Sequence, residues 1–569
     1  MTPTKLESSA LTNGAAEEVV VAYHERSKHH RHRYAASLGY MDWASQPDPF
    51  RRYDGAPLVQ LPLPDAAELP PFWQLYVPHG VPAARLSLDS VSRFFRYALS
   101  LTAWKELQST SWSLRANPSS GNLHPTEGYA LLPPLAALHD SAGLYHYAAK
   151  EHGLERRAEL AASAWAELAA TLPKDAFLVG LSSIHWREAW KYGERAFRYC
   201  QHDVGHALGS MRYAAAALGW RLRLEGGVDH ASLARLFGLD RDADYAGAER
   251  EHAALIALVL PGDGDDDCAL PLARILAAPM ATAAWHGSAN VLSAAHPVDW
   301  PVIDEAALAT TTPPTQPPVD ASFCDFPTEE QLFTPPVRDG AHSAARVILG
   351  RRSAVSMDGT TSIPRATFYR MLARLVPTAD RRALPWDALP WRPRLQLALF
   401  VHRIDDLTPG LYALARDPAQ VEPLRLAMSE DFHWHRPPAC PPGLPLHLLK
   451  AGDCRDLAAE VSCGQAIAGD GAFSLGMLAD THGSVATHGA GFYRNLFWEA
   501  GLVGHALYLE AEEAGIRSTG IGCYFDDLVH QVFGLSSRDW QILYHFTVGG
   551  PVDDPRLTTR PGYSPREAP

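Results

Sequence analysis

The chain has 569 residues, more than one hydrophobic core can hold, so we expect at least two domains. Hydrophobic residues make up 47% and charged residues 20% of the chain, as in ordinary soluble globular proteins. The formal net charge of -14 argues against a nucleic-acid partner, because binding to phosphates needs a basic face.

Cysteine usage and hydropathy favour a cytosolic protein. The chain has 7 Cys, and no two of them form a C-x-x-C pair. We therefore expect neither a disulfide framework nor a zinc site, and a reducing cytosol fits best. The N-terminal stretch has no apolar core long enough for a signal peptide, and no stretch approaches the roughly 20 apolar residues of a membrane span.

The predicted elements form two similar series along the chain. The first series is "SRFFRYALSL" (92–101, helix), "GYALLPPLAALHDSAGLYHY" (128–147), "VGHALGSMRYAAAALG" (204–219, helix) and "HAALIALVLPG" (252–262, strand). The second is "ATFYRMLARL" (366–375), "LQLALFVHRIDDLTPGLYAL" (395–414), "AGLVGHALYLEAEEAG" (500–515) and "WQILYHFTVGG" (540–550). Each half thus reads as α+β. The helix at 204–219 is apolar or small almost all round, so we expect it to be buried against a closely approaching helix.

The two series share one register. At a constant separation of 296 residues, and without a gap, Gly193 aligns with Gly489, Gly205 with Gly501, and Gly226 with Gly522. Glycines are usually placed for backbone geometry, so this register predicts duplicated domains. The Pro-rich stretch at 310–336 shows no helical or strand period and predicts an extended linker. We therefore expect a first domain with an N-terminal extension at 1–292, a linker at 293–340 and a second domain at 341–569.

Several motifs carry a resemblance to a known family. In the first half they are "YHERSKHH", "PSSGNLHPTEGY", "AGLYHY" and "WKYGERAFRY"; in the second, "GRRSAVSMDG", "SCGQAIAGDGAFSL", "LYLEAEEAGIRSTGIGCYFDD" and "LYHFTVGGP". The chain resembles the nitroreductase-like FMN flavoproteins, most of all their SagB-type branch, which includes azoline dehydrogenases of peptide-modification clusters. Members are usually homodimers that hold FMN in the interface. The resemblance therefore implies an α+β fold of two tandem nitroreductase-like domains that form an intramolecular pseudo-dimer.

The resemblance also distributes the flavin-binding residues over both domains. Arg351, Arg352 and Ser353 match the family's R-x-S segment, and Gly520, Ile521 and Gly522 match its turn near flavin N5. The segment that the other subunit contributes is matched by Pro118, Ser119, Ser120 and Asn122. The first half lacks an R-R-S, since it has "VPAARLSLDS", and the second lacks a P-S-S-G-N, since it has "LPWRPRLQLAL". We expect one composite site per chain and one decayed site.

Two details of this flavin site remain open at this point. The family often carries a second basic residue where this chain has Val355, so another cation must help to bind the phosphate, and Arg115 and Arg556 are the candidates. His124 lies inside the Ser-rich turn formed by residues 118–124, where it either contacts the flavin or caps the turn.

Lys191 and Tyr192 are the catalytic candidates. In azoline dehydrogenases a Lys-Tyr pair is associated with proton removal while hydride passes to the flavin, and a lysine with a tyrosine relay is chemically suited to that role. The second half has Thr487 and His488 in these places, so the fold itself does not require the pair. The alternative is an exposed lysine that precedes a structural tyrosine.

No metal site is expected. The segment "HHRHR", from His29 to Arg33, is interpreted as a basic surface segment, because no acidic or thiol partner lies nearby at ligand spacing.

Three functions are compatible with these residues. The first is an FMN-dependent oxidoreductase that dehydrogenates an azoline-type or related peptide-derived or small-molecule substrate by hydride transfer to flavin N5. The second is an NAD(P)H-dependent nitro or quinone reductase of the same fold. The third is a catalytically silent scaffold that binds a peptide or a protein. The Lys-Tyr pair favours the first.

Overall fold

The computed structural model describes residues 12–64, 69–226, 228–262, 280, 282–311, 323–333, 342–380 and 383–564. The expected linker therefore lies partly outside the described residues. Its described parts contain helices α8 (Pro301–Ala309) and α9 (Glu329–Leu332), so the stretch at 310–336 is not extended throughout. Helix α9 begins with a capping box, in which the Thr328 and Gln331 side chains accept hydrogen bonds from each other's backbone N–H. This capping box favours a short helix even though the sequence shows no helical periodicity.

Each half of the chain folds around an antiparallel sheet, and the two sheets have the same strand order. The first sheet runs β11-β7-β6-β5-β8-β10-β9, with β2 added to β7, and the second runs β15-β14-β13-β16-β18-β17. The first sheet comprises β2 (Leu58–Gln60), β5 (Thr126–Leu132), β6 (Gly143–Ala148), β7 (Gly153–Glu159), β8 (Phe177–Ser183), β9 (Arg221–Leu224), β10 (His252–Leu260) and β11 (Ala284–Trp285). The second comprises β13 (Leu395–Val401), β14 (Gly410–Leu414), β15 (Leu446–Ala451), β16 (Phe473–Asp480), β17 (Arg517–Ile521) and β18 (Trp540–Gly549). The expectation of two tandem α+β domains with the same strand order is confirmed.

Helices cover both sheets. In the first half they are α1 (Asn13–Arg26), α2 (Leu88–Ala98), α3 (Ala162–Ala169), α4 (His185–Tyr192), α5 (Ala196–Ala217) and α6 (His230–Phe237). In the second half they are α10 (Ala344–Gly350), α11 (Arg365–Ala373), α12 (Val421–Ala427), α13 (Arg455–Val461), α14 (Ile467–Asp470), α15 (Thr481–His488), α16 (Phe492–Glu513) and α17 (Asp526–Phe533). Among the helices that the structure describes, none combines the length and the apolar character that a membrane crossing needs.

The central strands are buried on both faces, as strand β5 illustrates. Ala130 and Leu132 enter the central hydrophobic cluster, which takes in side chains of both domains, whereas Tyr129 and Leu131 enter a separate cluster on the outer face. Alternate residues of a strand point to opposite faces, so β5 serves both cores. The result is an α+β fold of two domains joined through one shared core.

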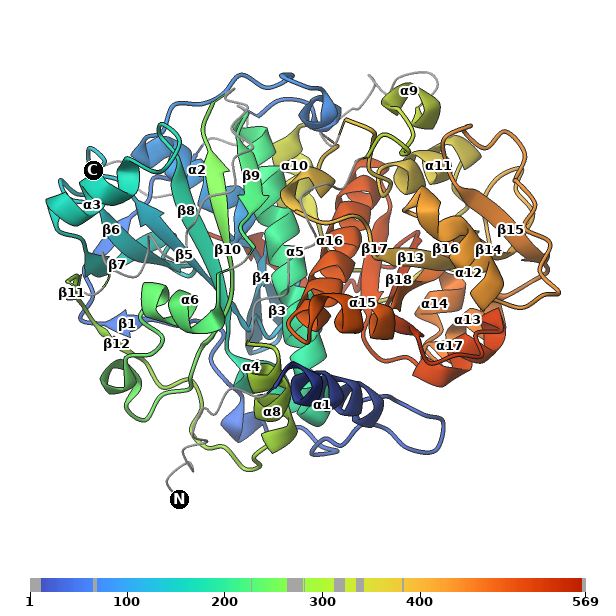
Figure 1. Ribbon diagram of the computed structural model, residues 1–569, viewed down its shortest axis with the longest axis horizontal. Coiled ribbons are helices and arrows are strands. Elements are labelled where there is room, and N and C mark those ends of the chain that lie inside the picture. Colours follow the sequence, from blue (N-terminus) through green and yellow to red (C-terminus); the bar gives the residue numbers. More distant parts are fainter. Residues whose placement is uncertain are drawn as a thin grey trace.

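The shared core is built on helices α5 and α16, which lie side by side in the centre of the molecule (Figure 1). All the residues of α5 are buried, as the small, apolar sequence predicted. A Cβ atom added to Gly205 would lie 2.2 Å from the backbone oxygen of Trp498, and one added to Gly501 would lie 2.2 Å from that of His202. These contacts are reciprocal in the duplicated numbering, as in a two-fold symmetric dimer.

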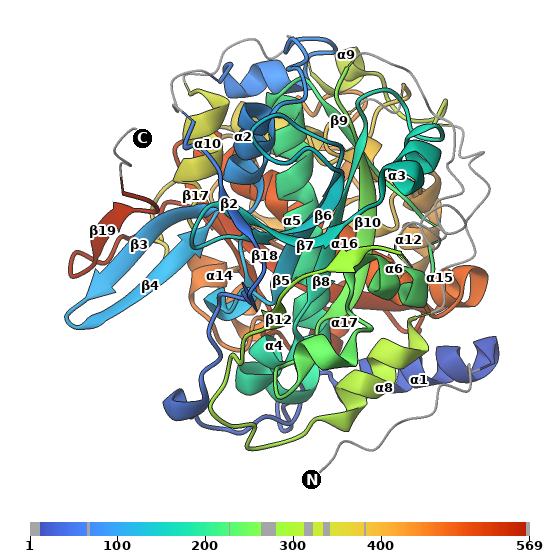
Figure 2. The ribbon, with the colours of Figure 1, turned by 90° about the vertical axis from the view of Figure 1, so that its left-hand side faces the viewer.

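Both termini also tie the domains together. Strand β19 (Thr558–Pro561), at the end of the second domain, pairs with β3 (Leu101–Leu107) of the first, which pairs with β4 (Thr110–Arg115). Figure 2 shows this three-stranded sheet projecting from the body of the molecule. Near the other terminus, α1 of the first domain packs against α8 and against α15 of the second domain. Strands β1 (Tyr53–Asp54) and β12 (Ser288–Ala289) form a small pair apart from the two large sheets.

The helix contact makes a testable prediction. Gly205→Ala and Gly501→Ala should each lower the free energy of unfolding by about 1–3 kcal/mol, because the added methyl group meets backbone that cannot move aside. Gly14→Ala is the control, since nothing lies within 4 Å of its added Cβ, and it should be neutral or slightly stabilising. Urea unfolding measures all three. Equal stability of G205A and wild type would contradict the close helix contact.

Candidate functional site

A cavity of about 1120 Å³ lies where the two domains meet. Its walls come from β3, β4 and α4 of the first domain, and from β17 and the segment after α10 in the second. The structure brings all the candidate residues except Arg556 to this one cavity: Arg115, Pro118, Ser119, Ser120, Asn122, His124, Lys191, Tyr192, Arg351, Arg352, Ser353, Gly520, Ile521 and Gly522.

The Ser-rich turn after β4 forms one wall of the cavity. Its backbone is left-handed at Gly121, Asn122 and His124, with φ of 57°, 60° and 52°. Ser119 Oγ accepts a hydrogen bond from the His124 backbone N–H at 2.8 Å, and Asn122 Nδ2 donates to Ser113 O at 2.9 Å. The His124 ring pairs with Asn122 Oδ1 at 3.0 Å, so it takes part in the hydrogen bonding of the turn and also lines the cavity.

Asp203 of α5 holds this turn in place through hydrogen bonds to Ser120. Its Oδ1 accepts hydrogen bonds from the backbone N–H and the hydroxyl of Ser120, both at 2.9 Å. Burial raises the pKa of Asp203 to about 7, although the hydrogen bonds from Ser119 and Ser120 act in the opposite direction.

Arg351 of the second domain holds the first residues of the turn. Its Nε donates to Ala116 O at 3.2 Å and its Nη2 donates to Arg115 O at 2.9 Å. Its Nη1 is buried and has no hydrogen-bond partner in the part of the chain that the structure describes. The guanidinium therefore fastens one domain to the other and still offers one donor group to a ligand.

The glycine turn of the second domain faces the Ser-rich turn. The Gly520 N–H donates to Tyr508 Oη at 3.1 Å, and that hydroxyl pairs with Ser353 Oγ at 2.8 Å. Tyr199 of the first domain donates to Gly522 O at 2.9 Å. A Cβ at Gly520 would lie 1.9 Å from Tyr544 Oη, so a larger residue there would have to displace the Tyr544 side chain.

Positive side chains gather along another part of the cavity. Three cationic side chains line it: Lys105 from β3, Arg352 from the segment after α10, and Arg517 from β17. Burial, and then the neighbouring charge of Arg351, lowers the pKa of Arg352 to about 10. Burial, and then the charge of Arg352, also lowers the pKa of Lys105. These cations repel one another, so a bound anion would stabilise the group.

Arg556 does not belong to this group. Its guanidinium pairs with Asp554 at 2.7 Å, and its side chain is 74% exposed. The expectation that it helps to bind a phosphate is corrected: an acidic neighbour two residues earlier holds it at the surface. Lys105 and Arg517, which sequence reasoning missed, line the cavity instead, and Arg517 also forms an ion pair with Asp553. The alignment of Arg517 with Arg221 in the duplicated register was the available signal for one of them.

Lys191 and Tyr192, at the end of α4, lie against the Ser-rich turn. A Cβ at Gly121 would lie 2.6 Å from Tyr192 Oη and 3.2 Å from Lys191 Nζ. Both side chains are half-buried, so the lysine is not an exposed surface residue. Glu188, one turn earlier, is fully buried, and neither of its carboxyl oxygens has a partner among the described residues. Burial, and then the neighbouring Asp203, raises the pKa of Glu188 well above its usual value.

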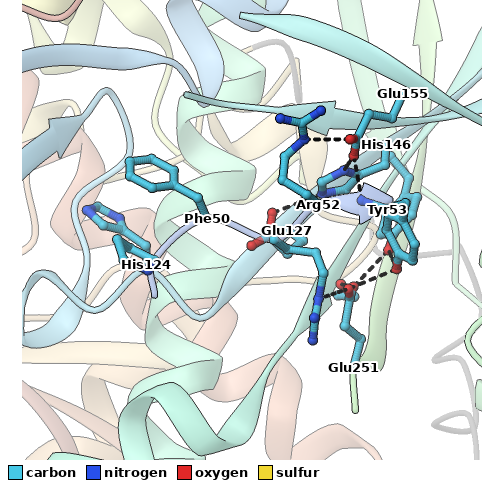
Figure 3. Close-up of polar contacts among 12 residues, drawn as sticks. Phe50, Arg52, Tyr53, His124, Glu127, His146, Glu155 and Glu251 are labelled. Carbon is cyan, nitrogen blue, oxygen red and sulfur yellow. Dashed lines mark hydrogen bonds and ion pairs between the residues drawn. The ribbon is translucent and has the colours of Figure 1, made fainter. Parts of the chain in front are cut away.

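A buried charged network supports the turn from the side of the sheet (Figure 3). Arg187 of α4 donates to His124 O at 2.7 Å and to Glu127 Oε1 at 2.5 Å. His146 pairs with Glu127 at 3.1 Å and with Glu155 at 2.9 Å. Burial alone would lower the pKa of His146, but the hydrogen bonds to these two carboxylates raise it to about 9. The network thus links β5, β6 and β7 to the backbone of the turn.

The interpretation of residues 29–33 as a surface segment is wrong for its first residue. His29 is buried and lines the cavity. Its backbone N–H donates to Asp526 Oδ2 at 3.0 Å, and its Nδ1 accepts a hydrogen bond from the Ala35 N–H at 3.0 Å. The backbone of the N-terminal extension here runs beside the second domain, which the sequence pattern does not reveal.

The position related to this cavity by the duplication is filled by side chains. Glu499, the counterpart of Asp203, accepts hydrogen bonds from Trp391 Nε1 at 3.2 Å and from the buried Arg416. Arg212, the counterpart of Tyr508, forms an ion pair with Asp387 at 2.7 Å. The neighbouring cavity, beside Tyr76 and Arg374, holds only about 30 Å³.

One group of possible metal ligands lies outside the cavity. His185, His252 and Asp304 have ligand atoms within 4.8 Å of one another. The two imidazole rings stack face to face at 4.0 Å, and the positive charge of Arg494 acts on both of them. We assign no metal to the group.

Comparisons with known proteins agree with the duplicated fold. The model of the nitroreductase family matches residues 84–248 and 444–550, one segment in each half of the chain. No curated protein matches the chain. A putative nitroreductase from Anabaena variabilis ATCC 29413 superposes with a TM-score of 0.65 at 20% identity, covering 94% of this chain and 99% of its own. The resemblance predicted from the motifs is therefore confirmed for the fold of both domains.

Two other solved structures are similar to part of the chain. A putative nitroreductase from Ralstonia eutropha JMP134 has a TM-score of 0.27 at 16% identity, over 39% of this chain and 95% of its own. A chain of the E. coli microcin synthetase McbBCD complex with truncated pro-MccB17 bound has a TM-score of 0.26 at 16% identity, over 45% of this chain and 95% of its own.

Asp203 makes a prediction about pH. Its usual pKa is 3.8 and its pKa in the folded protein is about 7, so between these values the unfolded chain loses this proton while the folded chain keeps it. The carboxyl therefore lowers the stability as the pH rises through this window. Asp203→Asn keeps an acceptor for Ser120 and cannot ionise. Its stability relative to wild type should rise by roughly 1 kcal/mol or more from pH 5 to pH 8.

Urea unfolding at both pH values measures this difference. Asp431→Asn, at an exposed site, is the control and should track wild type. A difference between D203N and wild type that stays constant from pH 5 to pH 8 would contradict the raised pKa.

Proposed function

We propose that this protein is an FMN-dependent oxidoreductase that binds one flavin per chain in the cavity between its domains. The observation that carries the proposal is the convergence on one cavity of a cationic group from both domains, two hydrogen-bonding turns and a Lys-Tyr pair. Neither domain alone has all of these parts.

The residues present fit a flavin mononucleotide. The cavity of about 1120 Å³ exceeds the ~300–1,000 Å³ typical of small-molecule sites, so it has room for a cofactor and a second molecule. Arg351 Nη1 and Asn117 Oδ1 line it as buried polar atoms that lack partners among the described residues. Buried polar groups are normally hydrogen-bonded, so both atoms favour a polar ligand.

In this proposal, different parts of the cavity bind the phosphate and the ring system of FMN. Lys105, Arg352 and Arg517 bind the phosphate, and the repulsion between them is relieved by its negative charge. The turn at 118–124 and the glycine turn at 520–522 supply hydroxyl, amide and backbone groups to the ring system. When bound, FMN supplies two-electron hydride chemistry.

Lys191 and Tyr192 handle the substrate proton in this proposal. Lys191 has no salt bridge within the described residues, and burial favours the neutral form of the nearby Glu188. Lys191 Nζ takes the proton from an azoline-type or related substrate, and the Tyr192 hydroxyl passes it on. The polar turn at Gly121 holds both groups at the cavity wall.

One site per chain follows from the asymmetry of the two halves. The place equivalent to the Ser-rich turn is closed by Trp391, Arg416 and Glu499, which hydrogen-bond among themselves. These side chains satisfy one another, and the neighbouring cavity holds only about 30 Å³, which supports one composite site and one decayed site.

The phosphate assignment is tested with two ligands. Arg352→Gln should weaken FMN binding by about 10- to 100-fold, because it removes a charged hydrogen-bond donor, and should leave the affinity for riboflavin, which has no phosphate, unchanged. Arg556→Gln is the matched control and should bind both ligands as wild type does. Fluorescence titration measures each affinity. Equal losses for FMN and riboflavin in R352Q would contradict the phosphate role.

The catalytic assignment is tested in protein loaded with FMN. Lys191→Ala should lower the rate of flavin reduction by a thiazoline-containing peptide by about 100-fold or more, with FMN affinity unchanged. Lys174→Ala, at an exposed lysine, is the control. Stopped-flow absorbance measures the rate. If wild type instead reduces its flavin rapidly with NADPH and not with the thiazoline, the protein is a reductase and not a dehydrogenase.

A further inference from the structure

Two thiols meet at the wall of the cavity. Cys463, in the loop after α13, and Cys523, which directly follows Gly522, place their sulfur atoms 2.7 Å apart. A disulfide bond is about 2.05 Å long, so a shift of less than an ångström separates the two atoms from bonding distance. Both residues are half-buried, and Cys523 lines the cavity.

Hydrogen bonds that do not involve the sulfur atoms hold these two segments together. Gln465 Nε2 donates to Ser462 O at 2.8 Å and to Cys523 O at 2.9 Å. The Phe525 N–H donates to Val461 O at 2.8 Å. These hydrogen bonds fasten the chain on both sides of the thiols, so their approach is part of the fold.

The surroundings make the two thiols unequal. The hydrogen bond from Cys463 and then that from His29 lower the pKa of Cys523, and the positive charge of Arg195 acts in the same direction. His29 Nδ1 accepts from the Ala35 N–H, so the ring proton is on Nε2 and is available to the Cys523 sulfur. The hydrogen bond with Cys523 raises the pKa of Cys463.

The other described thiols have no such surroundings. Burial raises the pKa of Cys440 to about 11 and that of Cys454 to about 12, and it raises the pKa of Cys200 as well. Thiolates are the reactive form of cysteine, so these residues are poor nucleophiles. Cys324 is exposed but does not line the cavity, so only the pair at the cavity combines mutual contact with access to a ligand there among the described thiols.

We propose that Cys463 and Cys523 form a redox-active dithiol–disulfide couple, with Cys523 as the attacking thiol and Cys463 as the resolving thiol. This couple shares a cavity wall with the proposed flavin site, but its exchange chemistry does not use the flavin. Its substrate class is a low-molecular-weight disulfide that enters through the cavity.

The couple works by two exchange steps. The Cys523 thiolate attacks one sulfur of the small disulfide, forms a mixed disulfide and releases the first small thiolate, which takes up a proton. Cys463 then loses its proton and attacks Cys523 Sγ; the internal disulfide forms and the second small thiol leaves. The protein dithiol is oxidised by two electrons and the small disulfide is reduced to two thiols, so atoms and electrons balance. Excess small thiol reverses both steps.

Peptide mapping of the full-length protein tests the proposal. Wild-type protein is incubated with glutathione disulfide, alkylated with iodoacetamide, digested and analysed by mass spectrometry. The expected product is a peptide pair cross-linked between Cys463 and Cys523, which dithiothreitol abolishes. Alkylation of both residues after oxidation, to the same extent as in untreated protein, would overturn the proposal.

Single variants separate the two roles. Cys463→Ser should trap one glutathionyl group on Cys523, whereas Cys523→Ser should leave Cys463 unmodified; Cys440→Ser is the control and should behave as wild type. In reduced wild-type protein at pH 7, Cys523 should react with iodoacetamide about tenfold faster than Cys440. This rate needs no variant and therefore does not depend on whether the variants fold. Equal rates at the two residues would contradict the assignment of Cys523 as the attacking thiol.

Discussion

The close approach of α5 and α16 is the constraint on which the rest of the structure depends. Gly205 and Gly501 let each helix backbone touch the other, and they set the distance between the domains. The same two helices carry Asp203, which anchors the Ser-rich turn, and Tyr508, which anchors the glycine turn. Any change in their separation would move the two walls of the cavity apart. The geometry of the site therefore depends on this helix contact.

A symmetric scaffold here carries an asymmetric site. The contacts between the helices are reciprocal, yet Asp203 is matched by Glu499 and Tyr508 by Arg212, and each counterpart is bound in local ion pairs or hydrogen bonds. A homodimer must keep every binding residue in its single sequence, because both copies are identical. In a fused pair each copy is free to lose the half-site that the other retains, and the proposal of one composite site per chain rests on this freedom.

Sequence predicted the parts of this structure that are encoded in local or repeated patterns. The glycine register predicted the duplication, and the single occurrence of Pro118–Asn122 predicted that the cavity would be composite. Lys105 and His29 were missed because no local sequence pattern marks them as cavity residues, whereas Arg517 stands three residues before the predicted turn at Gly520 and was overlooked. Arg556 was misplaced because Asp554 holds it locally. Cys463 and Cys523 are 60 residues apart, so only the fold shows that they meet.

The number of flavins bound per chain tests the central claim most directly. Protein saturated with FMN, freed of unbound flavin by gel filtration and denatured, gives a flavin absorbance that is compared with the chain concentration from amino-acid analysis. The account predicts one FMN per chain, bound in the cavity between the domains. Two FMN per chain would contradict the filled second position, and none would contradict the site itself.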